Sequence, residues 1–339
     1  MMDEHLVGVY YFAGWWRGEG SKYVVDGKDW TKDYPERVPL LGNYNDQETM
    51  DREILAARDG KVDFFQILWY TPGRDATPDS EHLNDGVKTF LASKNNSKLR
   101  FVMEFCNHPP FGIEDDAEWE KYSQEWARIL KHRSYLKLDG RPVFKIHGLD
   151  YFLRQNGGDP TRVARRIVNF RAVCKDAGAG DPIISAGVMP GGVPPVANVQ
   201  PYDFLTTYMD VPNVPMREKP YPYTVLLAQA EEGWKRYAQH SEIAYVPYLG
   251  AGWDPRPWKD PRPSFDMPTQ DKWIWALRSA KKALDIYPKL GIELKGGKKQ
   301  KMLLIYAWNE FGEGGIVAPT HGEQYMKLEG IKTVFSDRF

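Results

Sequence analysis

Residues 302–315, MLLIYAWNEFGEGG, are the most informative stretch of this chain. Its first part, Met302–Trp308, is almost continuously apolar, which is typical of a strand buried on both faces of a sheet. The run ends in Asn309 and Glu310, and a second glutamate, Glu313, follows in a glycine-rich turn. The pattern predicts a core strand that delivers two carboxylates to the loop at its carboxyl end.

Similar apolar runs recur along the chain, and most are separated by stretches with helical spacing. The expected strands cover Leu6–Phe12, Val62–Tyr70, Leu99–Phe105, Pro142–His147, Pro182–Val188, Tyr202–Tyr208, Ile243–Leu249 and Met302–Trp308. The expected helices cover Gln47–Arg58, Ser80–Ser93, Glu118–His132, Pro160–Ala177, Tyr223–Gln239, Gln270–Pro288 and Glu323–Thr333. No helix is expected between the fifth and sixth strands, where the chain runs through a loop at residues 191–195.

This alternation predicts a (β/α)8 barrel that occupies residues 1–339 as a single domain. A doubly wound open sheet is the main alternative. Such a sheet would place a glycine-rich phosphate loop after its first strand, but residues 12–16, FAGWW, are aromatic. No linker-like boundary and no internal repeat divides the chain.

The charge balance argues against two classes of partner. Lys and Arg number 45 and Asp and Glu number 46, so the net charge is −1. This balance favours neither nucleic acid nor a membrane surface as a partner. No apolar run has the length of a membrane helix, and strand-like residues begin at Leu6, so no signal peptide is expected. The compartment stays open, an extracytoplasmic one included.

The aromatic content is high, with 12 Trp and 19 Tyr. Many of these rings must be core, but indole and phenol rings at strand ends also suit the apolar C–H face of a sugar. Cys106 and Cys174 are expected to be buried free thiols, because two cysteines give no disulfide framework.

In a (β/α)8 barrel the active site is built at the carboxyl ends of the strands. Two carboxylates close together there suit acid–base catalysis on a glycosidic bond, so Glu310 and Glu313 are the candidate catalytic residues. The simplest alternative places them in a surface turn. Aromatic, amide, carboxylate and imidazole groups at the other strand ends suit a neutral, polyhydroxylated ligand. The candidate substrate-binding residues are Tyr10, Tyr11, Trp69, Tyr70, Glu104, His108, His147, Tyr208, Trp253, Asp254, Trp308 and Asn309.

Several of these candidates also have a structural interpretation. Tyr10 and Tyr11 point to opposite faces of a strand, so one of them is expected to fill the barrel. Trp69 suits the core as well as it suits a sugar platform. Glu104 equally suits a buried ion pair with Lys145 on the neighbouring strand.

The other polar candidates have alternatives too. Asp254 lies in a proline-rich loop, where it either contacts ligand or caps a turn. His108 and His147 suit hydrogen bonds to sugar hydroxyls. We expect no metal and no cofactor, because no metal-ligand spacing such as His-Glu-x-x-His is present.

The sequence resembles glycoside hydrolase family 99 and its wider relatives, including the WbsX-type proteins of polysaccharide biosynthesis. The matching pieces span nearly the whole chain, and the last is the most specific. They are Val9–Phe12, Asn45-Asp46 with Met50 and Glu53, Val62–Gln66 with Trp69-Tyr70, and Trp308–Gly314. The mannosidases of the family carry Trp-His where this chain has Phe311-Gly312, which is closer to the WbsX-type branch and leaves the sugar specificity open.

The resemblance implies a (β/α)8 barrel and retaining cleavage of α-mannosidic linkages inside a glycan. In the family mechanism the residue matching Glu310 acts as a base on the sugar's own 2-hydroxyl, and the residue matching Glu313 acts as general acid and then as base. Tyr208 matches a tyrosine near the reacting sugar. The implied partner is an oligosaccharide or polysaccharide.

Two other functions stay open at this point. The first is a glycosyltransferase, although no Asp-x-Asp motif lies in a suitable loop. The second is a barrel that binds carbohydrate without cleaving it. The sugar, the position of cleavage and the oligomeric state are not predicted.

Overall fold

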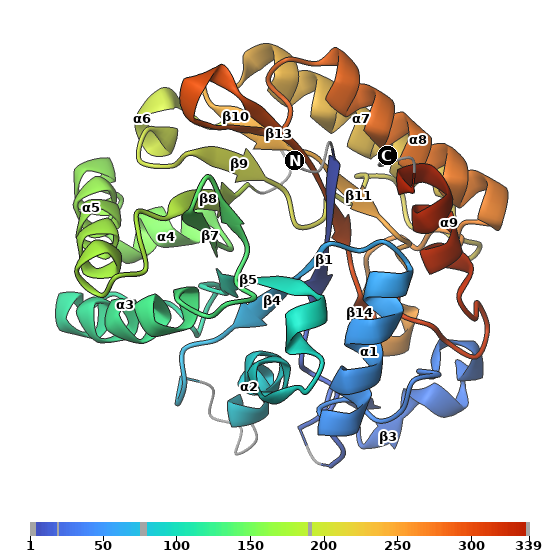
Figure 1. Ribbon diagram of the computed structural model, residues 1–339. Coiled ribbons are helices and arrows are strands. Elements are labelled where there is room, and N and C mark those ends of the chain that lie inside the picture. Colours follow the sequence, from blue (N-terminus) through green and yellow to red (C-terminus); the bar gives the residue numbers. More distant parts are fainter. Residues whose placement is uncertain (1–4, 19, 75–79, 189–191, 337–339) are drawn as a thin grey trace.

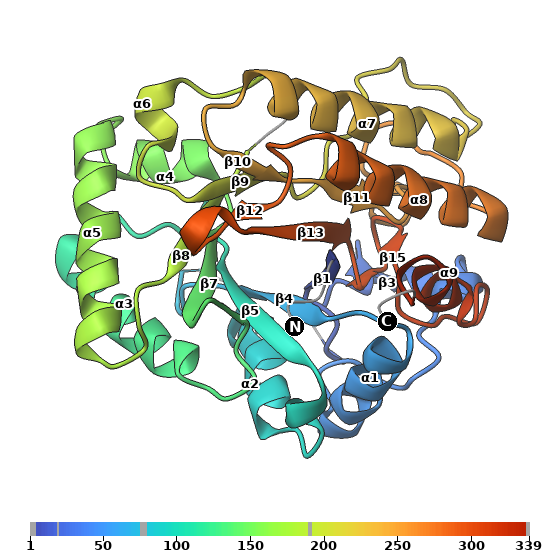
Figure 2. The ribbon, with the colours of Figure 1, turned by 45° about the horizontal axis from the view of Figure 1, so that its top comes forward.

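In this computed structural model of the chain, residues 5–18, 20–74, 80–188 and 192–336 are described. Parallel strands form the centre of the molecule and helices surround them (Figure 1, Figure 2). The strands are β1 (His5–Tyr11), β4 (Phe64–Trp69), β5 (Arg100–Phe105), β7 (Arg141–Ile146), β8 (Ile183–Gly187), β9 (Phe204–Thr206), β10 (Ala244–Val246), β11 (Tyr248–Gly250) and β13 (Lys299–Tyr306). Their spatial order is β10-β9-β8-β7-β5-β4-β1-β13-β11.

The seventh strand closes the barrel because it is shared between two neighbours. Its first part, β10, pairs with β9, and its second part, β11, pairs with β13. Pro247 separates the two parts and has no N–H to donate, but its carbonyl accepts from the Leu304 N–H at 3.0 Å. The predicted (β/α)8 barrel is therefore confirmed.

The helices lie outside the strands, as the figures show. They are α1 (Gln47–Asp59), α2 (Asp85–Ala92), α3 (Asp116–Leu130), α4 (Leu149–Gln155), α5 (Pro160–Asp176), α6 (Val196–Val199), α7 (Tyr223–His240), α8 (Gln270–Ile286) and α9 (Met326–Phe335). The prediction of no helix between the fifth and sixth strands is wrong, because α6 lies there. A helix of four residues is too short to show an apolar period. Gly191, in the loop predicted at residues 191–195, lies outside the described residues.

Local chemistry fixes the start of several helices. The Asp115 carboxylate accepts from the Glu118 N–H at 2.8 Å before α3, and Asp159 does the same for Thr161 at 2.8 Å before α5. Pro160 occupies the first position of α5, where its missing N–H costs nothing. The first turn of the helix expected at Ser80–Ser93 is instead a 3-10 helix, Ser80–Asn84.

Short elements complete the chain. They are β2 (Val24–Val25), β3 (Lys28–Asp29), β6 (Lys137–Leu138), β12 (Ile292–Glu293), β14 (Asn309–Glu310), β15 (Gly315–Ile316) and the 3-10 helices Trp30–Lys32, Pro35–Arg37, Asn96–Lys98, Arg256–Trp258 and Lys295–Gly297. The β2–β3 pair and two of these helices lie in the long connection from β1 to α1, which packs on the connection from β11 to α8.

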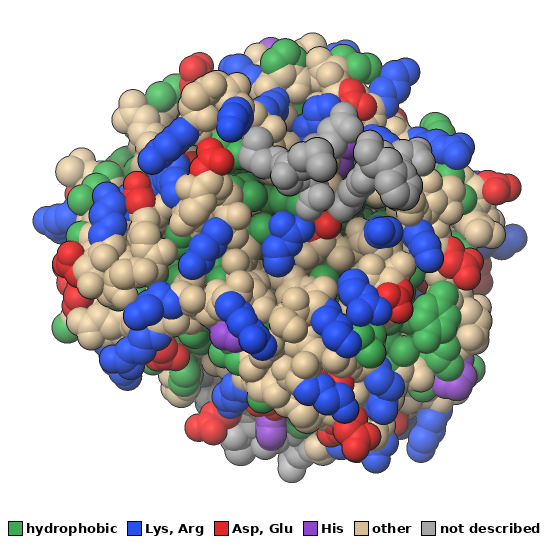
Figure 3. All heavy atoms as spheres, viewed as in Figure 1, with side chains coloured by type: hydrophobic (Ala, Val, Ile, Leu, Met, Phe, Trp, Pro, Cys, Tyr) green, Lys and Arg blue, Asp and Glu red, His purple; other side chains and the backbone are tan. Residues whose placement is uncertain are grey.

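Both cysteines are buried free thiols, as expected. No helix in the described part of the chain is long and apolar enough to span a membrane. On the face shown in Figure 3, Lys and Arg side chains are spread among Asp and Glu side chains, as the near-zero net charge suggests.

Candidate active site

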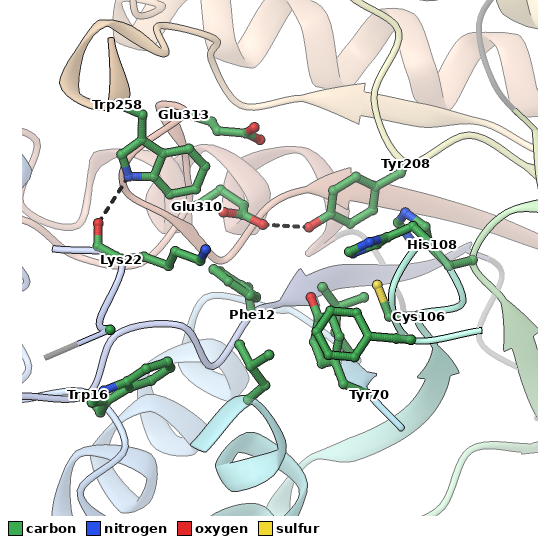
Figure 4. A pocket seen from close by; sticks show the side chains of 15 residues that line it. Phe12, Trp16, Lys22, Tyr70, Cys106, His108, Tyr208, Trp258, Glu310 and Glu313 are labelled. Atoms are coloured by element: carbon green, nitrogen blue, oxygen red, sulfur yellow. Dashed lines mark hydrogen bonds between the residues drawn. The ribbon is translucent and has the colours of Figure 1, made fainter. Parts of the chain in front are cut away.

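A cavity of about 270 Å³ opens at the carboxyl ends of the strands. It receives side chains from the β1–α1 connection, from the ends of β4, β5, β7 and β9, and from the segment after β13 (Figure 4). Six of the predicted site residues line it: Tyr70, His108, His147, Tyr208, Glu310 and Glu313. Residues from at least five strand ends therefore meet in one place, as expected for a barrel enzyme.

A hairpin after β13 brings the two glutamates together. Glu310 lies in β14, and the N–H groups of Glu313 and Gly314 donate to its carbonyl at 3.2 and 2.8 Å. Gly314 has a φ of 81°, and a Cβ there would lie 2.8 Å from the backbone nitrogen of Asp254. This turn accepts only glycine without rearrangement, and it places both carboxylates at the same cavity.

Glycine at position 312 makes room for an indole. A Cβ on Gly312 would lie 2.0 Å from the ring of Trp258, which lines the cavity beside both glutamates. The ring of Trp258 stacks on Trp15 with centroids 6.0 Å apart and an interplanar angle of 24°. Glycine at position 312 therefore lets Trp258 form part of the cavity wall beside both glutamates.

Glu310 is held by one phenol and keeps one oxygen free. The Tyr208 hydroxyl donates to Glu310 Oε1 at 2.7 Å, whereas the buried Oε2 has no hydrogen-bond partner among the described residues. Burial raises the pKa of Glu310 well above its ordinary value, and the nearby charge of Glu313 raises it further. The free oxygen is placed to accept a hydrogen bond from a ligand.

Glu313 is better partnered. Tyr306 donates to its Oε2, and Arg262 Nη2 lies 3.1 Å from its Oε1. Burial raises the pKa of Glu313, while the hydrogen bond from Tyr306 and the charge of Arg262 oppose this rise. Arg262 is fixed by Asp260 at 2.6 Å and lies over the ring of Trp253 at 4.4 Å.

The two carboxyl groups titrate as a pair. Because both are buried and repel each other when ionised, losing both protons is unfavourable, and the pair tends to retain one proton. Such a pair can supply one acid and one base at the same time.

Two histidines form the wall opposite the hairpin. His147 Nδ1 lies 2.7 Å from Glu104 Oε1, and His108 Nδ1 donates to the carbonyl of Pro109 at 2.9 Å. Burial lowers the pKa of His108, which favours its neutral form. Among the residues that the structure describes, no three His, Cys, Asp or Glu side chains come together as a metal site.

Glu104 does not line the cavity. It is fully buried and accepts from Lys145 at 2.9 Å, from Gln66 at 2.6 Å and from His147. Burial works against ionisation, but the charge of Lys145 and the hydrogen bond from His147 lower the pKa of Glu104 overall. The ion pair with Lys145 that the sequence suggested is therefore present, and Glu104 is not among the residues that line the cavity.

Both first-strand tyrosines and Trp69 also lie outside the cavity. The Tyr10 hydroxyl accepts from Lys145 Nζ at 2.9 Å inside the barrel. Tyr11 points outward and donates to Glu53 at 2.8 Å. Trp69 packs against Tyr122 on α3, because alternate residues of β4 face the helices.

The remaining candidates support the hairpin instead of lining the cavity. Trp308 donates to Glu53 at 2.7 Å, and Asn309 exchanges two hydrogen bonds with the backbone of Phe12 at 2.8 and 2.7 Å. Asp254 binds Arg37 and Arg256, so both of its oxygens are occupied by arginines. Trp253 lies beneath Arg262.

Some residues that shape the site were not among the candidates: Phe12, Trp16, Lys22, Trp258, Arg262 and Tyr306. Tyr306 could have been chosen from its position, because it is the last residue of the strand that leads to both glutamates. Lys22 and Arg262 come from loops that follow no periodic pattern.

Glu53 on α1 is a buried carboxyl that forms no ion pair among the described residues. It accepts from Tyr11 and Trp308, and burial raises its pKa from 4.5 to about 7 despite these hydrogen bonds. Below about pH 7 its neutral form is therefore preferred in the folded protein. The stability contribution of this group is complete below about pH 4.5 and is lost as the pH rises through 7.

We predict that Glu53→Gln removes this pH dependence. Wild-type protein should lose roughly 3 kcal/mol of unfolding free energy between pH 4 and 8 from this group alone, and the variant should not. Urea titrations at several pH values measure the difference. Glu48→Gln on the same helix is the control, because its side chain is 87% exposed. Equal slopes for wild type and Glu53→Gln would contradict the assignment.

Comparisons with known proteins agree with the fold. No protein-family model and no curated protein matches the chain. Among solved structures, a glycoside hydrolase-like protein matches with a TM-score of 0.65 at 13% identity, over 98% of this chain and 94% of that one. The family 99 endo-α-mannosidase of Bacteroides thetaiotaomicron matches with a TM-score of 0.60 at 14% identity, over 99% and 98%. A fungal β-1,4-galactanase matches with a TM-score of 0.53 at 12% identity, over 97% and 99%. The chain thus shares the barrel of these proteins, and its resemblance to family 99 extends to the fold.

Proposed function

We propose that the chain is one catalytic domain, a retaining glycoside hydrolase that cleaves α-linked glycans. The observation that carries this proposal is the pair Glu310 and Glu313 at a single cavity of a barrel, with one carboxylate oxygen free. The aromatic wall formed by Trp258 and Tyr70 suits the C–H face of a sugar ring. Structures that share this barrel include proteins whose names describe glycoside hydrolases.

The proposed reaction uses the sugar's own 2-hydroxyl. Glu310 Oε2 takes the proton of the 2-hydroxyl while the oxygen of that hydroxyl attacks C1. Glu313 gives its proton to the departing glycosidic oxygen. The product of this step is a 1,2-anhydro sugar. Water then attacks C1 and loses a proton to Glu313, while the 2-oxygen regains its proton from Glu310. Two inversions at C1 leave the configuration retained.

The neighbours of each glutamate support different parts of this scheme. The Oε2 of Glu310 has no hydrogen-bond partner among the described residues, so it remains available as an acceptor. The buried environment raises the pKa of Glu313, which an acid working near neutral pH requires.

The proposal is tested by incubating the protein with α-mannans, α-galactans and host-type glycans. Products are separated by chromatography, and the anomeric configuration of the first product is read by proton NMR. We expect at least one α-linked glycan to be cleaved with retention. Inversion would contradict the mechanism. Binding without products in prolonged incubation would instead identify a carbohydrate-binding barrel, and tight binding of a nucleotide sugar in calorimetry would identify a transferase.

A further inference from the structure

The proposed reaction has an electrostatic requirement that the two glutamates do not meet alone. Glu310 must be ionised to act as a base, yet burial and the charge of Glu313 both favour its protonated form. Arg262 donates a hydrogen bond to Glu313, and none to Glu310 is present among the described residues. A positive charge directed at Glu310 from another part of the molecule would oppose this effect.

Lys22 is in that position. Of the described residues that line the cavity, it carries the only permanent positive charge. Figure 4 shows its side chain reaching from the β1–α1 connection into the cavity, with the ammonium group on the side of Glu310. No acidic side chain of the described residues forms an ion pair with this ammonium group, so its charge is not neutralised by a dedicated partner.

Three hydrogen bonds hold the backbone of Lys22, although this residue lies in a surface loop. Its carbonyl accepts from the indole N–H of Trp30 at 2.8 Å and from that of Trp258 at 3.0 Å. Its own N–H donates to the carbonyl of Gly14 at 2.9 Å. These three bonds join the residue to the first connection and to the loop that carries Trp258.

The packing around Gly14 also leaves space for the aliphatic part of the Lys22 side chain. A Cβ on Gly14 would lie 2.8 Å from Lys22 Cγ, so the stem passes over a residue that has no side chain. Only the end of Lys22 is left to move, and it points at the cavity. This arrangement is more specific than that of a lysine on an open surface.

We propose that Lys22 is a positioning residue for the proposed hydrolysis, because its ammonium group stabilises the ionised form of Glu310 and so assigns the base role to that carboxylate and the proton to Glu313. This inference rests on the proposed function. It adds the reason why two similar carboxyl groups take opposite roles.

The other titratable groups around Glu310 do not supply this charge. They come from its own hairpin and from the ends of β4, β5, β7, β9 and β13, and are Glu313, Tyr70, Cys106, His108, His147, Tyr208 and Tyr306. The charge of Glu313 opposes ionisation of Glu310. The phenols and the thiol are neutral at neutral pH, since burial raises the pKa of Tyr70, Cys106 and Tyr208. His147 directs Nδ1 to Glu104, and burial favours neutral His108.

The test follows the ionisation of Glu310 directly. Protein labelled with 13C at the glutamate carboxyl carbons is titrated by NMR, and Glu310→Gln identifies the resonance of Glu310. Lys22→Met keeps the stem and removes the charge, so the pKa of Glu310 should rise by about one pH unit. Lys22→Arg should restore it. Raising the salt from about 0.01 M to 1 M should move wild type toward Lys22→Met, because the charge is exposed to solvent.

Lys259→Met is the matched control. It removes a positive charge from the neighbouring loop, but that ammonium group already binds Asp26 at 2.7 Å. The Glu310 titration should therefore stay unchanged. Where the wild type cleaves a glycan, the rise of kcat/KM with pH should shift upward in Lys22→Met by the same amount as the NMR titration.

Two results would overturn the inference: a Glu310 titration unchanged in Lys22→Met, or an equal shift in Lys259→Met. The proposed function fails separately, when wild-type protein cleaves none of the glycans. The NMR titration still decides the role of Lys22 in that case, because it needs no turnover.

Discussion

Replacing Glu313 by glutamine is expected to lower cleavage of natural glycans by about 10³-fold, since a positioned general acid contributes about 10² to 10⁴. Glutamine fills the same space and accepts the same hydrogen bond from Tyr306, but it has no proton to give. The loss should fall on kcat, with little change in KM, because the substrate is still bound. Steady-state kinetics on the glycan found to be cleaved measures both constants.

A change of leaving group separates the two carboxyl groups. An aryl glycoside with an acidic phenol needs little protonation, so Glu313→Gln should form its first product at close to the wild-type rate. Glu310→Gln should be inactive on both substrates, because the 2-hydroxyl loses its base. Glu242→Gln, an exposed glutamate before β10 at the other end of the barrel, is the control. If Glu313→Gln cleaved natural glycans at the wild-type rate, Glu313 would not be the general acid.

The second large effect is expected from Arg37→Ala. Arg37 is 5% exposed, forms an ion pair with Asp254 and donates to the carbonyls of Asp254 at 2.8 Å and Phe311 at 3.2 Å. Phe311 lies between the two glutamates, and the Asp254 N–H donates to the Glu313 carbonyl at 2.6 Å. Removing Arg37 leaves two carbonyls without this donor and leaves the buried Asp254 carboxylate with the half-exposed Arg256 as its remaining cation. Unfolding in urea should show a loss of about 3 to 5 kcal/mol.

Arg256→Ala provides the comparison for this variant. Arg256 binds the same carboxylate of Asp254 at 2.6 Å, but its side chain is 47% exposed, so its removal should cost about 1 kcal/mol or less. At temperatures where Arg37→Ala is still folded, its kcat should fall, because the hairpin loses a fixed point beside both glutamates. Equal unfolding free energies of Arg37→Ala and Arg256→Ala would contradict the expectation that the buried Arg37 contributes more to stability than the exposed Arg256.

The barrel and the position of the carboxylate pair could be predicted from the sequence for a simple reason. Strands buried on both faces must be apolar throughout, and the helices between them keep their own period. The eighth strand ends at a pair of glutamates, and every strand of such a barrel ends at the same rim. The order of residues along the chain therefore suffices to place Glu310 and Glu313 at the cavity.

The other residues that line the cavity are harder to predict from the sequence. All seven residues of β1 are buried, so no alternation in polarity distinguishes Tyr10, inside the barrel, from Tyr11, which faces Glu53. Likewise Trp69 packs against α3 whereas the next residue, Tyr70, lines the cavity. Both faces of such a strand are apolar, so pattern alone does not tell which ring a ligand meets.

The sequence by itself determined the barrel, the glycine-rich turn that follows its last strand and the two glutamates at that turn, because these depend on local order and on the period of apolar residues. Only the tertiary structure decided how the charges are shared. Arg262 contacts Glu313 from 51 residues away, and Lys22 is held by Trp258 across 236 residues. The ionisation of a buried carboxyl depends on burial and on charges nearby in space, and neither is encoded in the spacing of residues along the chain.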